Sequence, residues 1–189
     1  MNRAERSEVG WTIRRALSRD ATPLSEVAAR IFNDTFASSN SAEDMELYRS
    51  QTFTPAAMAA EMEDPDADLL VAVCNDAIVA YAQLHFGNAL EIAGPGPWAE
   101  LKRFYVLASM HGSGLAQELM RAVAERAHVR DAATLWLGVW EHNARAIRFY
   151  SRLGFREVGE QPFMLGNDLQ RDLIMAAPVS GLHPAPGLT

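Results

Sequence analysis

Residues 111–116 read His-Gly-Ser-Gly-Leu-Ala, and their flanking segments make them the stretch that decides the fold. Residues 101–106 before them predict a β-strand, and residues 114–127 after them carry apolar side chains at helical spacing. Two glycines let the backbone approach a ligand closely, and the first N–H groups of a helix point along the positive end of its dipole. This order suits a pyrophosphate, although a glycine loop before a helix is also ordinary turn chemistry.

The letters of this loop do not fit two better-known phosphate-binding patterns. A Walker loop needs Lys and then Ser or Thr after its last glycine, whereas Leu115 and Ala116 follow Gly114. A dinucleotide fingerprint needs a third small residue, where this chain has Gln117, and it belongs in a first strand–helix unit. The loop therefore predicts another kind of phosphate ligand.

A second informative segment, residues 143–155, reads Asn-Ala-Arg-Ala-Ile-Arg-Phe-Tyr-Ser-Arg-Leu-Gly-Phe. Asn143 and Tyr150 are seven positions apart, about two helical turns, so both project from one face with Ala146 between them. Asn143 is also a good helix N-cap and Gly154 a good helix stop, so capping alone accounts for both. Tyr150 could equally be an amphipathic residue half inside the core.

The rest of the chain predicts strands alternating with helices. Thr22-Pro23 and Thr54-Pro55 each predict a helix start, and the polar segment 33–40 predicts turns, with a flexible wall between the two helices. The predicted strands are 11–16, 69–74, 78–86, 101–106, 134–139, 155–158 and 171–175, with 161–170 as a connecting segment.

Composition excludes several classes of protein. The length of 189 residues fits one domain, and 49% hydrophobic with 22% charged residues is typical of a globular chain. A net charge of -7 disfavours a general nucleic-acid binder and would attract a cationic acceptor. Cys74 is the single cysteine, so no internal disulfide can form, and the five scattered His do not make a metal site. We see no secretory signal and no spanning apolar run, so we expect a soluble, cytoplasmic protein without membrane contact.

Taken together, these segments resemble the GNAT superfamily of acetyltransferases. Residues 101–106, LKRFYV, are similar to the family's central strand, HGSGLA to its Arg/Gln-x-x-Gly-x-Gly/Ala loop, and NARAIRFYSRLGF to its late helix. His111 stands where the family usually has Arg or Gln, which weakens a side-chain contact to phosphate. The resemblance implies an α/β fold with a central mixed, mostly antiparallel sheet flanked by helices. We expect a flexible N-terminus at 1–10, the GNAT domain at 11–176 and a flexible tail at 177–189.

The resemblance also implies a cofactor, acetyl-coenzyme A, and residues that would hold it. The central strand would pair with the pantetheine arm, the loop amides would hold the pyrophosphate, and Arg152 would approach a nucleotide phosphate or end a solvated helix. The implied cofactor-binding residues are Tyr105, Val106, His111, Gly112, Ser113, Gly114, Leu115, Ala116, Asn143, Ala146 and Arg152.

Two residues are the predicted catalytic groups. The resemblance makes Tyr150 the general acid that protonates the leaving thiolate. A primary amine, with a pKa near ~10.4, must lose a proton before it attacks a thioester, so a base is required. Glu100, where relatives carry an acidic residue, is the candidate base through water; an exposed surface carboxylate is the equal alternative. No metal is needed.

The acceptor is the least determined part of the prediction. Residues 136–143, 163–168 and 32–36 resemble the PaiA-type bacterial enzymes, which acetylate spermidine and spermine, so a polyamine is the leading acceptor hypothesis. Acetylation of a protein N-terminus or lysine is one alternative, and a non-catalytic acetyl-coenzyme A sensor is another. Many GNAT proteins dimerise, so a homodimer is one expected state.

Overall fold

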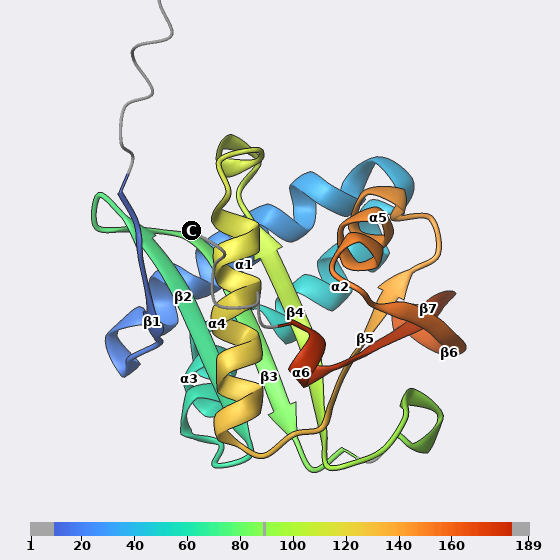
Figure 1. Ribbon diagram of the computed structural model, residues 1–189. Coiled ribbons are helices and arrows are strands. Elements are labelled where there is room, and N and C mark those ends of the chain that lie inside the picture. Colours follow the sequence, from blue (N-terminus) through green and yellow to red (C-terminus); the bar gives the residue numbers. More distant parts are fainter. Residues whose placement is uncertain (1–9, 89, 183–189) are drawn as a thin grey trace, which may run out of the picture.

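The computed structural model describes residues 10–88 and 90–182, which form one seven-stranded sheet with helices on both faces (Figure 1). The strand order is β1-β2-β3-β4-β5-β7-β6, and only the β4–β5 pair is parallel. The strands are β1 (Thr12–Arg15), β2 (Ala67–Cys74), β3 (Ala77–Phe86), β4 (Trp98–Val106), β5 (Thr134–Trp140), β6 (Arg156–Leu165) and β7 (Asp168–Pro178). The helices are α1 (Ala21–Phe36), α2 (Ala42–Thr52), α3 (Pro55–Glu63), α4 (Leu115–Val129), α5 (Ala144–Arg152) and α6 (Val179–Leu182). The predicted fold class is confirmed.

Strands β4 and β5 separate along their length, and this separation positions the site. They are paired over a short stretch, in which Trp98 lies opposite Thr134 and Glu100 lies opposite Trp136. Figure 1 shows the two strands diverging beyond that point. The register between β3 and β4 shifts so that Gln83 faces Arg103 while Leu84 faces Leu101, which leaves Lys102 as an extra residue. Such a bulge bends and twists its strand. The bend accounts for the gap that opens between β4 and β5.

Each face of the sheet has its own hydrophobic core. One core packs α4 and α5 on the sheet and includes Phe104 and Val106 of β4 as partly buried members. The other packs α1, α2 and α3 on the opposite face and includes Tyr105. Because side chains alternate along a strand, β4 presents aromatic rings to both faces at the point where it leaves β5. Within residues 10–88 and 90–182, no helix is long and apolar enough to cross a membrane.

Local patterns placed the start of α3 correctly and the first helical region less well. Thr54 caps α3 by accepting a hydrogen bond from the Ala57 amide, as its sequence predicts. Helix α1 begins at Ala21, so the predicted N-cap Thr22 lies inside the helix, and α1 continues to Phe36, inside the segment 33–40 that was predicted as turns. Helix α2 occupies most of the predicted flexible wall, where Phe32 stacks on Tyr48 at 5.0 Å. Packing of these rings outweighs the polar composition that predicted a loop.

The C-terminal part of the chain is more regular than its sequence predicts. The predicted connecting segment 161–170 belongs to the β6–β7 hairpin, which turns at Gly166 with a positive φ of 60°. Strand β7 continues to Pro178, and Val179 of α6 is 2% exposed. The described part of the predicted tail, 177–182, is therefore packed against the domain; its remainder and the N-terminal segment 1–9 lie outside the described residues.

Candidate functional site

Four cavities adjoin one another along the gap between β4 and β5. The loop cavity, about 550 Å³, and the slot, about 170 Å³, share Val106, His111, Ala116, Arg145 and Phe149. The slot and the inner cavity, about 130 Å³, share Tyr105, Asn143, Ala146 and Tyr150. The inner cavity and the outer cavity, about 600 Å³, share Trp140 and Gln170. The row leads from the glycine loop, past Tyr150, to the edge formed by β5, β6 and β7.

The loop 111–116 offers fewer free amides than its sequence predicts. The His111 and Ser113 amides donate to the carbonyls of Ala108 and Met110, and the Leu115 amide donates to Ser113 Oγ at 3.2 Å. The amides of Gly112, Gly114 and Ala116 have no acceptor within the described residues. Gly112 and Gly114 have φ values of 79° and 98°, a region that only glycine enters at low cost. Alternate N–H groups are therefore left for a ligand.

Helix α5 adds positive charge to the loop cavity. Arg145, Arg148 and Arg152 line it from one face, at the i, i+3, i+7 spacing of neighbouring turns. None of the three pairs with a carboxylate within the described residues. Sequence reasoning singled out Arg152 alone, although the spacing of all three was visible. The three cations and the free amides together suit a ligand with several phosphate charges.

His111 lies at the junction of the loop cavity and the slot. Its Nε2 donates to the Val106 carbonyl at 3.0 Å, the group predicted to pair with the pantetheine arm. Burial lowers the pKa of His111, so the imidazole is neutral at pH 7. In this structure, the side chain that replaces the family's Arg or Gln closes the end of β4 and does not contribute a charge.

Asn143 and Tyr150 both line the boundary between the slot and the inner cavity, as the helix spacing predicted. Asn143 caps α5 by accepting a hydrogen bond from the Ala146 amide at 3.1 Å. That bond uses Oδ1 and leaves the Nδ2 donors free, so the capping role and a ligand role are compatible.

The Tyr150 ring is fixed by aromatic packing. Its centroid lies 5.4 Å from that of Phe149, 5.6 Å from Phe155 and 6.3 Å from Phe104. Burial raises the pKa of the Tyr150 phenol above its usual value. The phenol therefore keeps its proton at neutral pH, and it can act as a proton donor.

Glu100 is not brought to this row of cavities. It lies in the paired part of β4, opposite His85 and Trp136, and its carboxylate accepts a hydrogen bond from Asn88 Nδ2 at 2.8 Å. It lines none of the four cavities described above. The candidate base thus stands where the β4–β5 gap has not yet opened.

Asp172 of β7 is the acidic residue that sequence reasoning missed. It lines the inner cavity with Tyr105 and Tyr150 and is 8% exposed, and no described residue donates a hydrogen bond to its carboxylate. Burial raises the pKa of its carboxyl to about 6. A Cβ atom on Gly138 of β5 would lie 3.1 Å from its Oδ2, so that glycine leaves room for the carboxylate. The available signal was an acidic residue directly before the apolar run 173–177.

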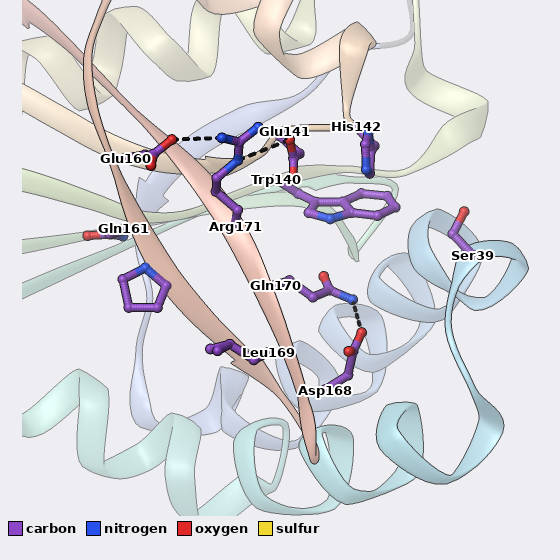
Figure 2. Close-up of a pocket in the computed structure, with 11 residues that line it drawn as sticks. Ser39, Trp140, Glu141, His142, Glu160, Gln161, Asp168, Leu169, Gln170 and Arg171 are labelled. Carbon is purple, nitrogen blue, oxygen red and sulfur yellow. Dashed lines mark hydrogen bonds and ion pairs between the residues drawn. The ribbon is translucent and has the colours of Figure 1, made fainter.

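The outer cavity is open and carries charges that are largely paired (Figure 2). Arg171 donates to Glu160 at 2.9 Å and to Glu141 at 3.1 Å, and Gln170 donates to Asp168 at 2.8 Å. The Trp140 ring lies between these side chains and His142, with which it makes an edge contact at 5.1 Å. This cavity offers an aromatic wall and a route from the inner cavity to the surface.

Comparisons with known proteins agree with the fold. Residues 28–155 match the family described as "Acetyltransferase (GNAT) family". An uncharacterized N-acetyltransferase of Mycobacterium tuberculosis is 33% identical over 156 residues, covering 82% of this chain and 96% of that protein. The spermine/spermidine N(1)-acetyltransferase of Bacillus subtilis is 33% identical over 64 residues, covering 33% of this chain and 42% of that protein. The crystal structure of the PaiA N-acetyltransferase of Thermoplasma acidophilum in complex with coenzyme A has a TM-score of 0.72 at 19% identity, covering 89% and 99% of the two chains.

Proposed function

This chain belongs to the GNAT acetyltransferase family and is an N-acetyltransferase that uses acetyl-coenzyme A, and we propose that it acetylates a primary amine bound in the inner cavity. The observation that carries the proposal is the row of adjoining cavities, in which Tyr150 lines both the slot and the inner cavity. Donor and acceptor would therefore approach that phenol from opposite sides.

The residues present fit the cofactor. Its pyrophosphate matches the free amides of Gly112, Gly114 and Ala116, and its further phosphate charge matches the arginines of α5. The slot between Phe104, Asn143 and Phe149 is narrow and largely apolar, as a pantetheine arm requires, and Asn143 Nδ2 would donate to an amide carbonyl there. When bound, acetyl-coenzyme A supplies an activated acetyl thioester.

In the proposed mechanism, two side chains move protons. The Asp172 carboxylate takes a proton from the acceptor ammonium, directly or through water, because burial has raised its pKa to about 6 and the group is still basic near neutral pH. As the free amine forms its bond to the acetyl carbon and the carbon–sulfur bond breaks, Tyr150 Oη donates its proton to the departing sulfur. The second proton lost by the new amide nitrogen restores the phenol, and Asp172 releases its proton to water. The surrounding rings hold the phenol in place. Asp172 takes the role that the sequence had suggested for Glu100.

The polyamine hypothesis keeps limited support. The net charge of -7 favours a cationic acceptor, and one stretch of 64 residues resembles the spermine/spermidine enzyme. That match covers a third of the chain, and the inner cavity contains Arg103 and Lys102, which would repel a polycation. We therefore propose the coarser class, a small primary amine, with polyamines as members to be tested.

Replacement of Tyr150 by Phe tests the enzyme function. The variant lacks the proton donor but keeps the ring packing, so we expect kcat to fall by about 100-fold or more while the Kd for acetyl-coenzyme A stays unchanged. Thiol release in an amine panel measures the first quantity and calorimetry the second. Tyr81→Phe is the matched control, since Tyr81 is buried and lines none of the four cavities, and its hydroxyl has no hydrogen-bond partner in the described part of the chain. Full activity of Tyr150→Phe would show that the phenol is not the proton donor, whereas a wild type that binds acetyl-coenzyme A and acetylates no amine or peptide would favour the sensor alternative.

A further inference from the structure

The floor of the inner cavity contains a buried guanidinium that the proposed reaction does not use. Arg103 lines this cavity from β4, and its side chain is 11% exposed. Its Nη1 donates to Gln83 Oε1 and, at 3.3 Å, to Glu61 Oε1. The Phe53 ring lies 5.7 Å from its central carbon and covers one side of the guanidinium. These neighbours hold the cation at the cavity wall.

The Arg103 guanidinium has unused hydrogen-bonding capacity. An arginine side chain carries five N–H donors in a planar fork. Both contacts to protein oxygens involve Nη1, and Nε and Nη2 have no acceptor within the described residues. Buried polar groups are normally paired, and a guanidinium with a free edge is the side chain that best matches a planar carboxylate.

The charges around Arg103 do not cancel within the protein. Among residues 10–88 and 90–182, Glu61 is the one carboxylate that pairs with Arg103, and the same carboxylate also pairs with Lys102 at 3.3 Å. Lys102 lines the inner cavity as well. Two cations thus share one anion on the β4 side, whereas on the β7 side the Asp172 carboxylate accepts no hydrogen bond from the part of the chain that the structure describes. The cavity has one unbalanced positive wall and one negative wall.

We propose that the acceptor is a small amine that also carries a carboxylate, with Arg103 binding the carboxylate and Asp172 facing the amine. The inference rests on the proposed function and names its substrate class. At about 130 Å³, the inner cavity is smaller than the roughly 300–1,000 Å³ of typical ligand pockets, so it suits the compact head group of an α-amino acid. The rest of the acceptor extends past Trp140 and Gln170 into the outer cavity.

The test compares acceptors that differ only in the carboxylate. Free α-amino acids are assayed beside their carboxamides, their decarboxylated amines and spermidine, with thiol release as the readout. We expect kcat/KM for the acid to exceed that for the carboxamide by about tenfold or more, because the neutral analogue offers no anionic acceptor to the free Nε and Nη2 donors of Arg103. The carboxamide has the more easily deprotonated amine, so amine basicity cannot produce this preference.

Two variants with opposite expected effects make the assignment specific. Arg103→Gln should bring the acid-to-carboxamide ratio close to one, whereas Glu61→Gln removes the competing carboxylate and should increase the ratio. Arg103→Lys keeps the charge but loses the fork and should give an intermediate ratio. The Kd for acetyl-coenzyme A should stay unchanged in all three, because Arg103 and Glu61 line neither the slot nor the loop cavity. Melting curves check that each variant is folded.

The possible failures can be told apart. If the wild type acetylates carboxamides, decarboxylated amines or spermidine as well as the acids, or if Arg103→Gln keeps the ratio, the carboxylate assignment is wrong while the amine acetyltransferase stands. If acetyl-coenzyme A does not bind, the proposed function itself fails. If it binds and no member of the panel is acetylated, the assignment of carboxylate-bearing amines is overturned as well.

Discussion

The surroundings of Asp172 set both its acid–base behaviour and the stability that the fold loses by burying its carboxylate. A carboxylate that is removed from water without a hydrogen-bond donor is destabilised, and its pKa rises in proportion. In this chain the pKa reaches about 6, so the group is mostly ionised at pH 7 and still basic enough to take a proton. The room that Gly138 leaves for it is part of the same arrangement.

The first prediction at this scale concerns activity. Asp172→Asn should lower kcat/KM by about 100-fold and remove the inflection near pH 6 from the pH–rate profile of the wild type. The wild-type rate should rise with pH through that inflection, because the base is active when deprotonated. The exposed Glu125→Gln serves as a control for loss of one carboxylate. A variant whose profile still bends near pH 6 would show that another group is the base.

The same substitution should stabilise the fold at alkaline pH. The folded-state pKa of Asp172 is raised above its usual value of 3.8, so the charged form weakens the fold as pH rises through about 6, and below about 4 the carboxyl is neutral in both states. Because part of the carboxylate still faces the cavity, Asp172→Asn should raise the free energy of unfolding at pH 8 by about 1–2 kcal/mol. The gain should shrink at pH 5. Urea unfolding at the two pH values measures it, and equal or lower stability at pH 8 would contradict the pKa argument.

At the scale of single elements, helix α5 is predicted to act as the cationic side of the phosphate site. Arg148→Gln should weaken acetyl-coenzyme A binding about five- to tenfold and reduce the salt dependence of the Kd, since one screened charge is lost. Calorimetry at two salt concentrations measures both effects. Arg156→Gln at the start of β6 removes a charge that is also exposed and lies outside the four cavities, and it should change neither quantity. If Arg148→Gln and Arg156→Gln bind acetyl-coenzyme A with the same Kd, Arg148 of α5 does not contact the phosphates.

Helices and strands that neighbouring residues specify were predictable from the sequence. The strand before residue 111, the loop and α4 follow from apolar spacing and two glycines, and α5 follows from Asn143 and its own periodicity. Helix α2 was not predictable, because its one buried residue, Met45, gives no apolar stripe and its stability comes from packing on α1. Its N-cap Ser41, which accepts from the Asp44 amide, was the only local sign.

The catalytic base required long-range information that local patterns do not contain. Glu100 precedes the central strand in the sequence, which made it the candidate, but β4 is still paired with β5 at that residue. Asp172 reaches the cavity because β7 pairs with β5, which brings it opposite Trp140 and close to Gly138. The separation of β4 from β5 depends on a one-residue bulge at Lys102, and a bulge has no reliable signature in a single sequence.

At the scale of the whole molecule, the site depends on elements far apart in the chain. Helix α1 provides Ile31 and Thr35 to the slot, β4 and α5 provide its walls, and β7 provides Asp172 to the inner cavity. Strand β7 lies between β5 and β6 in the sheet, and its N-terminal half, which carries Asp172, pairs with the part of β5 that has separated from β4. Its C-terminal end pairs with the part of β5 that is still joined to β4, so losses at that end should lower the stability of the fold that holds the site.

A pair of shortened chains tests this dependence. A chain ending at Ala176, the predicted domain boundary, loses Ala177 and Pro178, which pair with Leu135 and Thr134 of β5, and it loses Val179, whose amide donates to the Ala133 carbonyl at 2.9 Å. Compared with a chain ending at Leu182, it should be less stable by roughly 2–4 kcal/mol, from the burial of one valine and the loss of two strand pairs. Thermal and urea unfolding measure the difference, which comes from residues 177–182 alone because both chains lack everything after Leu182.

The shorter chain should also bind acetyl-coenzyme A more weakly near its melting temperature, where part of it is unfolded. Equal stability of the two chains would mean that the described end of β7 and α6 adds nothing to the fold, and the domain would then end where the sequence suggested.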